Sequence, residues 1–102
     1  MVIITHLVYT FTSMVTQLAS KNFTSQENEL LTIMAEEAAE VAIECSKIIR
    51  FGGSGNKLSK EIGDLWAMVE LAHKMDLVSF NIIDEQIPKK WEKLKVYSDL
   101  EI

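Results

Sequence analysis

Acidic residues take the place of hydrophobic ones on the apolar stripes of two neighbouring segments. The first stripe joins two apolar residues and three acids at steps of three and four: Leu30, Ile33, Glu37, Glu40 and Glu44. The second stripe repeats this stepping: Glu61, Asp64, Met68, Leu71 and Met75. Residues three and four apart share one face of an α-helix. Both segments are therefore predicted to be helices that turn carboxylates toward the interior.

Carboxylates in such positions need cations nearby. Burying an ionised carboxylate costs several kcal/mol unless a cation neutralises it, and the first segment has no compensating lysine before Lys47. Mg²⁺ prefers oxygen ligands and keeps waters and substrate phosphates in its shell. The pairs Glu37/Glu40 and Glu61/Asp64 place their Cβ atoms about 5–6 Å apart, close enough to converge on one ion. The pattern predicts a divalent metal site.

Four segments have helical periodicity, at about 5–20, 25–50, 56–75 and from about 79 onward. Thr24 and Glu27 have the spacing of a capping box. Glycines after Arg50 predict the end of the second helix. Pro88 is expected to kink the fourth helix or to start a fresh turn, and Gly63 to allow close approach of the preceding helix. Short links between such segments predict an all-α four-helix bundle, in one domain over residues 1–102.

Charge and composition exclude several classes. The net charge is −5, and no basic run occurs in the first half, so nucleic-acid binding is not expected. The apolar start, residues 1–19, is too polar to span a bilayer, so no membrane partner is expected. The lone Cys45 excludes an internal disulfide and a cysteine zinc site, and suits a reducing cytoplasm. A chain of 102 residues has a small core, which predicts at least a dimer.

Two motifs carry a resemblance to a known family. The run Glu36-Glu37-Ala38-Ala39-Glu40, followed by Glu61-Ile62-Gly63-Asp64, resembles the E-E-x-x-E and E-x-x-D signature of the MazG-like all-α nucleotide pyrophosphohydrolases. Continued through Val41, the first run is similar to the HisE branch, the phosphoribosyl-ATP pyrophosphohydrolases. Residues 46–52 and 89–94 look like short stand-alone members encoded by phages. The resemblance covers roughly residues 30–97.

The resemblance implies a four-helix fold assembled as a dimer or dimer of dimers. It also implies a hydrolase that uses Mg²⁺ or Mn²⁺ to cleave a nucleoside triphosphate to monophosphate and pyrophosphate. By position, the metal ligands would be four acids: Glu37, Glu40, Glu61 and Asp64. Glu36 would orient the attacking water or help hold a second ion, which makes Glu36, Glu37 and Glu40 the catalytic set. Four basic residues would meet the substrate phosphates: Lys89, Lys90, Lys93 and Arg50.

Three hypotheses of function follow. The first is a (d)NTP pyrophosphohydrolase of nucleotide metabolism in the cytoplasm of a bacterium or phage-infected cell, with a purine nucleotide such as dGTP or dATP as candidate substrate. The second is a phosphoribosyl-ATP pyrophosphohydrolase, and the third a non-catalytic helical interaction module. Glu70 and His73 have the spacing of half a diiron site, but they lie on the helix face opposite the acids. Trp66 and Trp91 are predicted to lie in the core, and no residue is assigned to the base.

Overall fold

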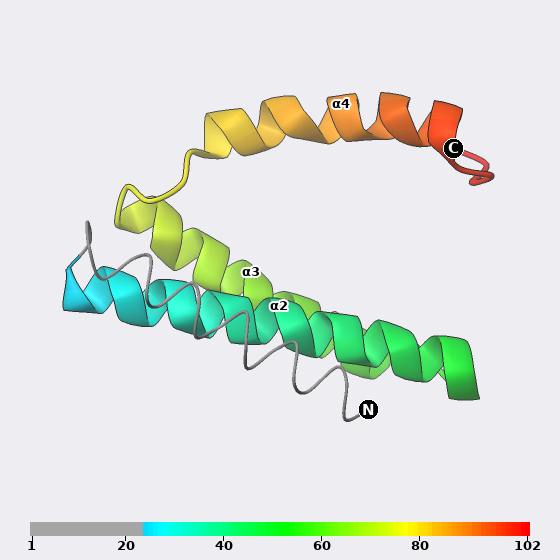
Figure 1. The fold of residues 1–102 in the computed structure, drawn as a ribbon, viewed down its shortest axis with the longest axis horizontal. Coiled ribbons are helices and arrows are strands. Elements are labelled where there is room, and N and C mark those ends of the chain that lie inside the picture. Colours follow the sequence, from blue (N-terminus) through cyan, green and yellow to red (C-terminus); the bar gives the residue numbers. More distant parts are fainter. Residues whose placement is uncertain (1–23) are drawn as a thin grey trace.

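The computed structural model describes residues 24–102, and the helix predicted at 5–20 lies outside them. The described residues form three helices and no strand (Figure 1): α2 (Ser25–Phe51), α3 (Asn56–Lys74) and α4 (Phe80–Tyr97). The prediction of an all-α chain is confirmed for this part. The predicted bounds of these helices agree with the observed ones to within one residue.

Local signals explain where α2 begins and ends. The Thr24 hydroxyl accepts a hydrogen bond from the Glu27 backbone N–H at 3.2 Å, and the Glu27 carboxylate accepts from the Thr24 N–H, which completes the predicted capping box. After Phe51 the chain enters the left-handed region at Gly52 and Gly53, with φ of 73° and 109°. Glycine adopts such angles without a Cβ clash, so α2 stops here.

Hydrogen bonds define the connection from α3 to α4. Asp76 has a φ of 59°, and the Leu77 N–H donates to the Ala72 carbonyl at 2.9 Å, as in a Schellman ending. The Ser79 hydroxyl then accepts from the Ile82 N–H at 3.3 Å and caps α4. Pro88 lies inside α4, and the helix continues through it to Tyr97. Pro88 therefore does not start a new helix, which was one of the two expected outcomes.

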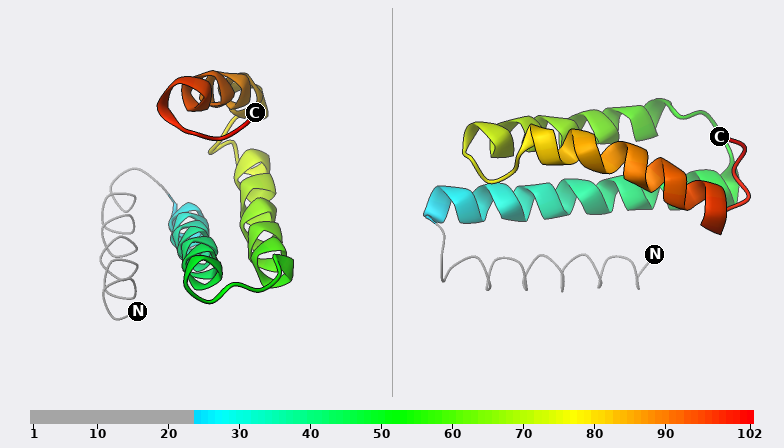
Figure 2. Two further views of the ribbon diagram at one scale, coloured as in Figure 1. Left: turned by 90° about the vertical axis from the view of Figure 1, so that its right-hand side faces the viewer. Right: turned by 90° about the horizontal axis from the view of Figure 1, so that it is seen from above.

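The helices α2 and α3 form an antiparallel hairpin, and α4 stands apart from it (Figures 1 and 2). Among the described helices, only α2 and α3 pack extensively against one another. The described residues bury just three hydrophobic side chains, those of Leu30, Ala35 and Ala72. They therefore do not build the predicted four-helix bundle, because α4 stands apart from the hairpin and does not pack on it. No helix in this part of the chain is long and apolar enough to cross a membrane.

Gly63 does not serve the close helix approach that its place between the acids predicted. A Cβ added at Gly63 would meet no atom within 4 Å, and the residue is exposed. Glu61 faces α2, and a residue two positions further lies about 200° around the helix. The prediction was wrong because Gly63 lies on the side of α3 that points away from α2.

Candidate metal centre

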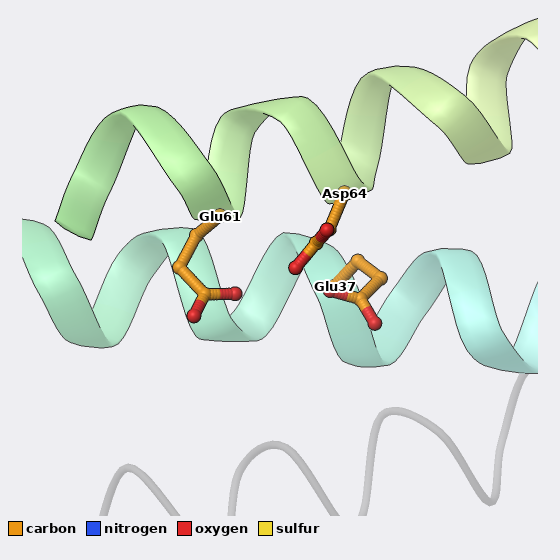
Figure 3. Close-up of side chains that lie close together, drawn as sticks. All are labelled: Glu37, Glu61 and Asp64. Atoms are coloured by element: carbon orange, nitrogen blue, oxygen red, sulfur yellow. The ribbon is translucent and has the colours of Figure 1, made fainter. Parts of the chain in front are cut away.

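Three carboxylates converge between α2 and α3. Glu37 comes from α2, whereas Glu61 and Asp64 come from successive turns of α3 (Figure 3). One oxygen from each lies within 4.8 Å of the others. Glu37 and Glu61 are half-buried and Asp64 is exposed, so the cluster opens to solvent on one side. Such a set offers three oxygen ligands to one ion and leaves room for water or phosphate.

The loop between the helices sets which residues face each other. Glu37 lies 14 residues before the end of α2, about 21 Å along its axis, whereas Glu61 lies only about 8 Å from the start of α3. The loop from Gly52 to Gly55 must therefore run back along α2 by about 13 Å, within the reach of its residues. Figure 2 shows the loop extending between the offset helix ends. The stagger is what brings Glu37 opposite Glu61 and Asp64.

Mutual repulsion marks the cluster. Partial burial raises the pKa of the Glu37 carboxyl, and the negative charges of Asp64, Glu61, Glu40 and Glu36 raise it further, in that order. Both effects disfavour the ionised form of Glu37. A cation placed among these oxygens would reverse the balance, because its charge favours the carboxylate.

Glu36 and Glu40, also assigned to the site from the sequence, stand at its margin. Both are exposed, and neither belongs to the group of three whose oxygens meet. Their charges nevertheless act on Glu37. The structure thus brings together Glu37, Glu61 and Asp64, and leaves the other two acids on the adjoining surface of α2.

Glu44, the last acid on the α2 stripe, has a different partner. It is the one buried charged residue of the described part, at 5% exposure. Its carboxylate lies 3.2 Å from the Lys47 Nζ and 3.6 Å from the Lys57 Nζ. Lysines therefore neutralise this acid, although the sequence pattern placed Glu44 on the same inward-facing stripe as Glu37 and Glu40. Sequence reasoning missed Lys57, because it lies on the other helix and no local spacing links it to Glu44.

The basic residues expected at the phosphates lie away from the acids. Lys89, Lys90 and Lys93 are exposed on α4, which stands apart from the hairpin (Figure 1). Arg50 is 13 residues from Glu37 along α2, about 20 Å. Its guanidinium lies over the Phe51 ring, 5.2 Å from the centroid. Within one chain, the structure does not bring these four side chains to the carboxylate cluster.

His73 takes a packing role at the α3–α4 connection. Its ring stacks on Phe80, with centroids 3.7 Å apart and an interplanar angle of 14°. Asp76 and Ile82 join it in lining a shallow pocket there, which none of the clustered acids lines. This agrees with the argument that His73 lies away from the acid face, and no sequence signal pointed to the stack.

The two tryptophans are not in the core. Trp66 is 53% exposed on α3 and Trp91 is 50% exposed on α4, so the prediction that both are core residues was wrong for the described chain. The reason is the position of α4, which stands apart from the hairpin, so that no other described helix covers either ring.

The residues of the cluster fit a hard divalent cation. Carboxylate oxygens are the ligands that Mg²⁺ and Mn²⁺ take in proteins, and the site lacks the thiolate or imidazole ligands that favour softer metals. Comparison with known proteins finds no matching family model, no matching curated sequence and no matching solved structure. The chemistry of the cluster and its motif are therefore the basis for assigning a function.

Proposed function

We propose that this protein is a metal-dependent hydrolase of phosphoric anhydrides. More specifically, we propose a nucleoside triphosphate pyrophosphohydrolase that uses Mg²⁺, or Mn²⁺ in its place, to release pyrophosphate from a (d)NTP. The observation that carries the proposal is the convergence of Glu37, Glu61 and Asp64 within 4.8 Å.

The charge balance supports this assignment. Glu37 is under repulsion from four other acids, and no lysine among residues 24–102 pairs with it, whereas two lysines pair with Glu44 two stripe positions further on. Without a bound cation, the repulsion within the acid cluster destabilises the fold. The cluster can stabilise the protein only when a cation binds to it. Glu37 therefore has the surroundings of a ligand, and Glu44 those of a structural ion pair.

Each acid has a proposed role. Glu37, Glu61 and Asp64 hold the cation, and Glu40 joins them by a change of side-chain rotamer. When bound, the ion neutralises phosphate charge and lowers the pKa of a bound water. Glu36, exposed beside Glu37, orients the attacking water or helps hold a second ion. The open side of the cluster at Asp64 admits the triphosphate.

The finer parts of the proposal concern substrate and assembly. A purine nucleotide such as dGTP or dATP is the first candidate substrate. Its only support is the similarity of residues 36–41 to the HisE branch. Lys89, Lys90, Lys93 and Arg50 are proposed phosphate contacts, which requires an arrangement that brings them closer than a single chain does. We further propose a homodimer or homotetramer in which the missing layers of a four-helix bundle are completed, working in the cytoplasm.

The test is pyrophosphate release from a panel of nucleoside triphosphates, with Mg²⁺ and with a chelator. Activity that needs the metal and disappears in Glu37→Gln supports the proposal. Glu29→Gln is the matched control, since Glu29 is an exposed acid on the same helix. Equal activity in wild type and Glu37→Gln would remove the proposal.

Two other functions remain in competition. A phosphoribosyl-ATP pyrophosphohydrolase would use the same acids, and would be recognised by release of pyrophosphate from phosphoribosyl-ATP but not from the (d)NTP panel. A non-catalytic helical interaction module is favoured by the exposed apolar residues of α4. That function predicts no pyrophosphate release from any substrate with any divalent metal.

A further inference from the structure

Lys57 lies one helical turn from the acid cluster, on the same face of α3. Lys57, Glu61 and Asp64 follow one another at steps of four and three, so Lys57 shares the face on which the two acids point toward α2 (Figure 3). Residues four apart have Cβ atoms about 5–6 Å apart. The other two lysines of α3, Lys60 and Lys74, do not fall on this stepping. Lys57 therefore brings a positive charge to the edge of the cluster within a single chain.

Glu44 holds Lys57 in place without engaging it fully. The Lys57 Nζ lies 3.6 Å from the carboxylate of the buried Glu44, across the hairpin. At this separation the two groups form an ion pair but no hydrogen bond. Lys47 is closer, since its Nζ donates to the same carboxylate at 3.2 Å. The Lys57 side chain is 66% exposed, against 39% for Lys47. Lys47 alone would therefore keep Glu44 neutralised if the Lys57 ammonium turned to another anion.

A filled metal site needs a further cation beside the metal. The three carboxylates of Glu37, Glu61 and Asp64 outweigh the two charges of one divalent ion, so the site stays negative overall. When the bridge between the α- and β-phosphates breaks, the developing negative charge falls on the pyrophosphate. A lysine ammonium meets such a phosphate as a point charge with three donors. Lys57 can supply that charge without any movement of α4.

The order of residues along the hairpin gives the leaving group a direction. Glu36 precedes Glu37 on α2, on the side away from the connecting loop, whereas Lys57 lies on the loop side of Glu61. In such displacements the attacking and leaving oxygens lie roughly in line across the phosphorus. Water oriented by Glu36 forms a bond from its oxygen to the α-phosphorus. The bond to the bridging oxygen breaks, its electron pair leaves with the pyrophosphate toward Lys57, and a proton of the water passes to solvent.

We propose that Lys57, held beside the cluster by Glu44, binds the pyrophosphate leaving group. This rests on the proposed function and deepens it, because it names a phosphate contact that a single chain supplies. Lys47 has the structural role of neutralising Glu44, whether or not pyrophosphate is bound.

The first experiment is calorimetric titration of the full chain with inorganic pyrophosphate in the presence of Mg²⁺. Lys57→Gln is expected to weaken pyrophosphate binding about tenfold, because a charge-assisted hydrogen bond is lost. Lys57→Arg keeps the charge and should bind like wild type. Lys74→Gln is the matched control, since Lys74 is an exposed lysine about 20 Å from Glu61 along the same helix. Equal binding in wild type and Lys57→Gln, or an equal loss in Lys74→Gln, would overturn the inference.

A comparison with Lys47 separates pyrophosphate binding from a purely structural role. Lys47→Gln is expected to lower the free energy of unfolding more than Lys57→Gln does, and to leave pyrophosphate affinity unchanged. The reverse order would show that Lys57 serves only Glu44, and would overturn the inference.

The same titration distinguishes this inference from the proposed function. If wild type releases pyrophosphate from a nucleoside triphosphate with Mg²⁺ while Lys57→Gln keeps full affinity for pyrophosphate, the inference alone fails. If wild type neither releases nor binds pyrophosphate, both fail.

Discussion

Glu37 on α2 and Asp64 on α3 approach each other across the hairpin, with carboxylate oxygens within 4.8 Å (Figure 3). Two like charges at this separation repel, and Glu61 adds a third. The helices α2 and α3 nevertheless pack against one another. The arrangement lowers the stability of the metal-free protein and raises that of a protein that holds a cation. These opposite effects on stability can be tested in several independent ways.

Removing one charge at Glu37 is expected to separate metal binding from stability. Glu37→Gln should weaken Mg²⁺ binding at least tenfold and reduce pyrophosphate release on the order of 100-fold, because a ligand is lost. The same change should stabilise the metal-free protein by a few tenths of a kcal/mol at neutral pH, because repulsion is relieved. Calorimetric titration and denaturant unfolding measure the two effects. A variant that loses stability along with metal would contradict the electrostatic account.

The pH dependence of stability should change sign with metal. Because the folded-state pKa of Glu37 is raised above its ordinary value of 4.5, Glu37 favours folding below that value. This contribution is lost as the pH rises through the raised pKa. Metal-free protein should therefore lose stability on going from mildly acidic to neutral pH at this site. Glu37→Gln should flatten that slope, and Glu29→Gln should not.

With saturating Mg²⁺ the trend should reverse. Metal ligands must be deprotonated, so the affinity for Mg²⁺ rises with pH and the bound ion stabilises the fold more at neutral pH than at acidic pH. Thermal unfolding measured across this pH range, with Mg²⁺ and with a chelator, checks whether the two pH trends have opposite sign. Parallel curves in the two conditions would show that no divalent ion binds to the ionised cluster.

Glu44 should behave as a structural residue. Glu44→Gln removes the charge that Lys47 and Lys57 share, and we expect a loss of about 1 kcal/mol in the free energy of unfolding. The loss is smaller than for a fully buried pair because both lysines can return to water. Mg²⁺ affinity should stay near that of wild type. A large fall in metal affinity, with stability retained, would instead place Glu44 at the metal.

Gly63 should tolerate a side chain. Since an added Cβ meets open space, Gly63→Ala is expected to stabilise the protein by about 1 kcal/mol through the higher helix propensity of alanine. Pyrophosphate release should be unchanged, although Gly63 lies between Glu61 and Asp64 in the sequence. Denaturant unfolding and the activity assay together check this. Loss of stability would mean that another chain packs closely on this part of α3.

The sequence by itself determined the local structure. The Thr24–Glu27 capping box, the glycines after Phe51 and the Ser79 cap involve residues within a few positions of one another, so their effect can be worked out without knowing the fold. The acid stripes could also be predicted from the sequence, because helical spacing assigns residues to faces. Hence the three described helices and the meeting of α2 and α3 acids were predictable.

Only the tertiary structure decided which acids have which partners. The stagger set by the Gly52–Gly55 loop brings Glu37 to Glu61 and Asp64, places Lys57 beside Glu44, and leaves Glu36 and Glu40 at the margin. Likewise, the bonded turn at Asp76 sends α4 away from the hairpin. The physical reason is the same in both cases: the offset and direction of one helix relative to another depend on backbone angles in a few connecting residues. Helical periodicity carries no information about those angles.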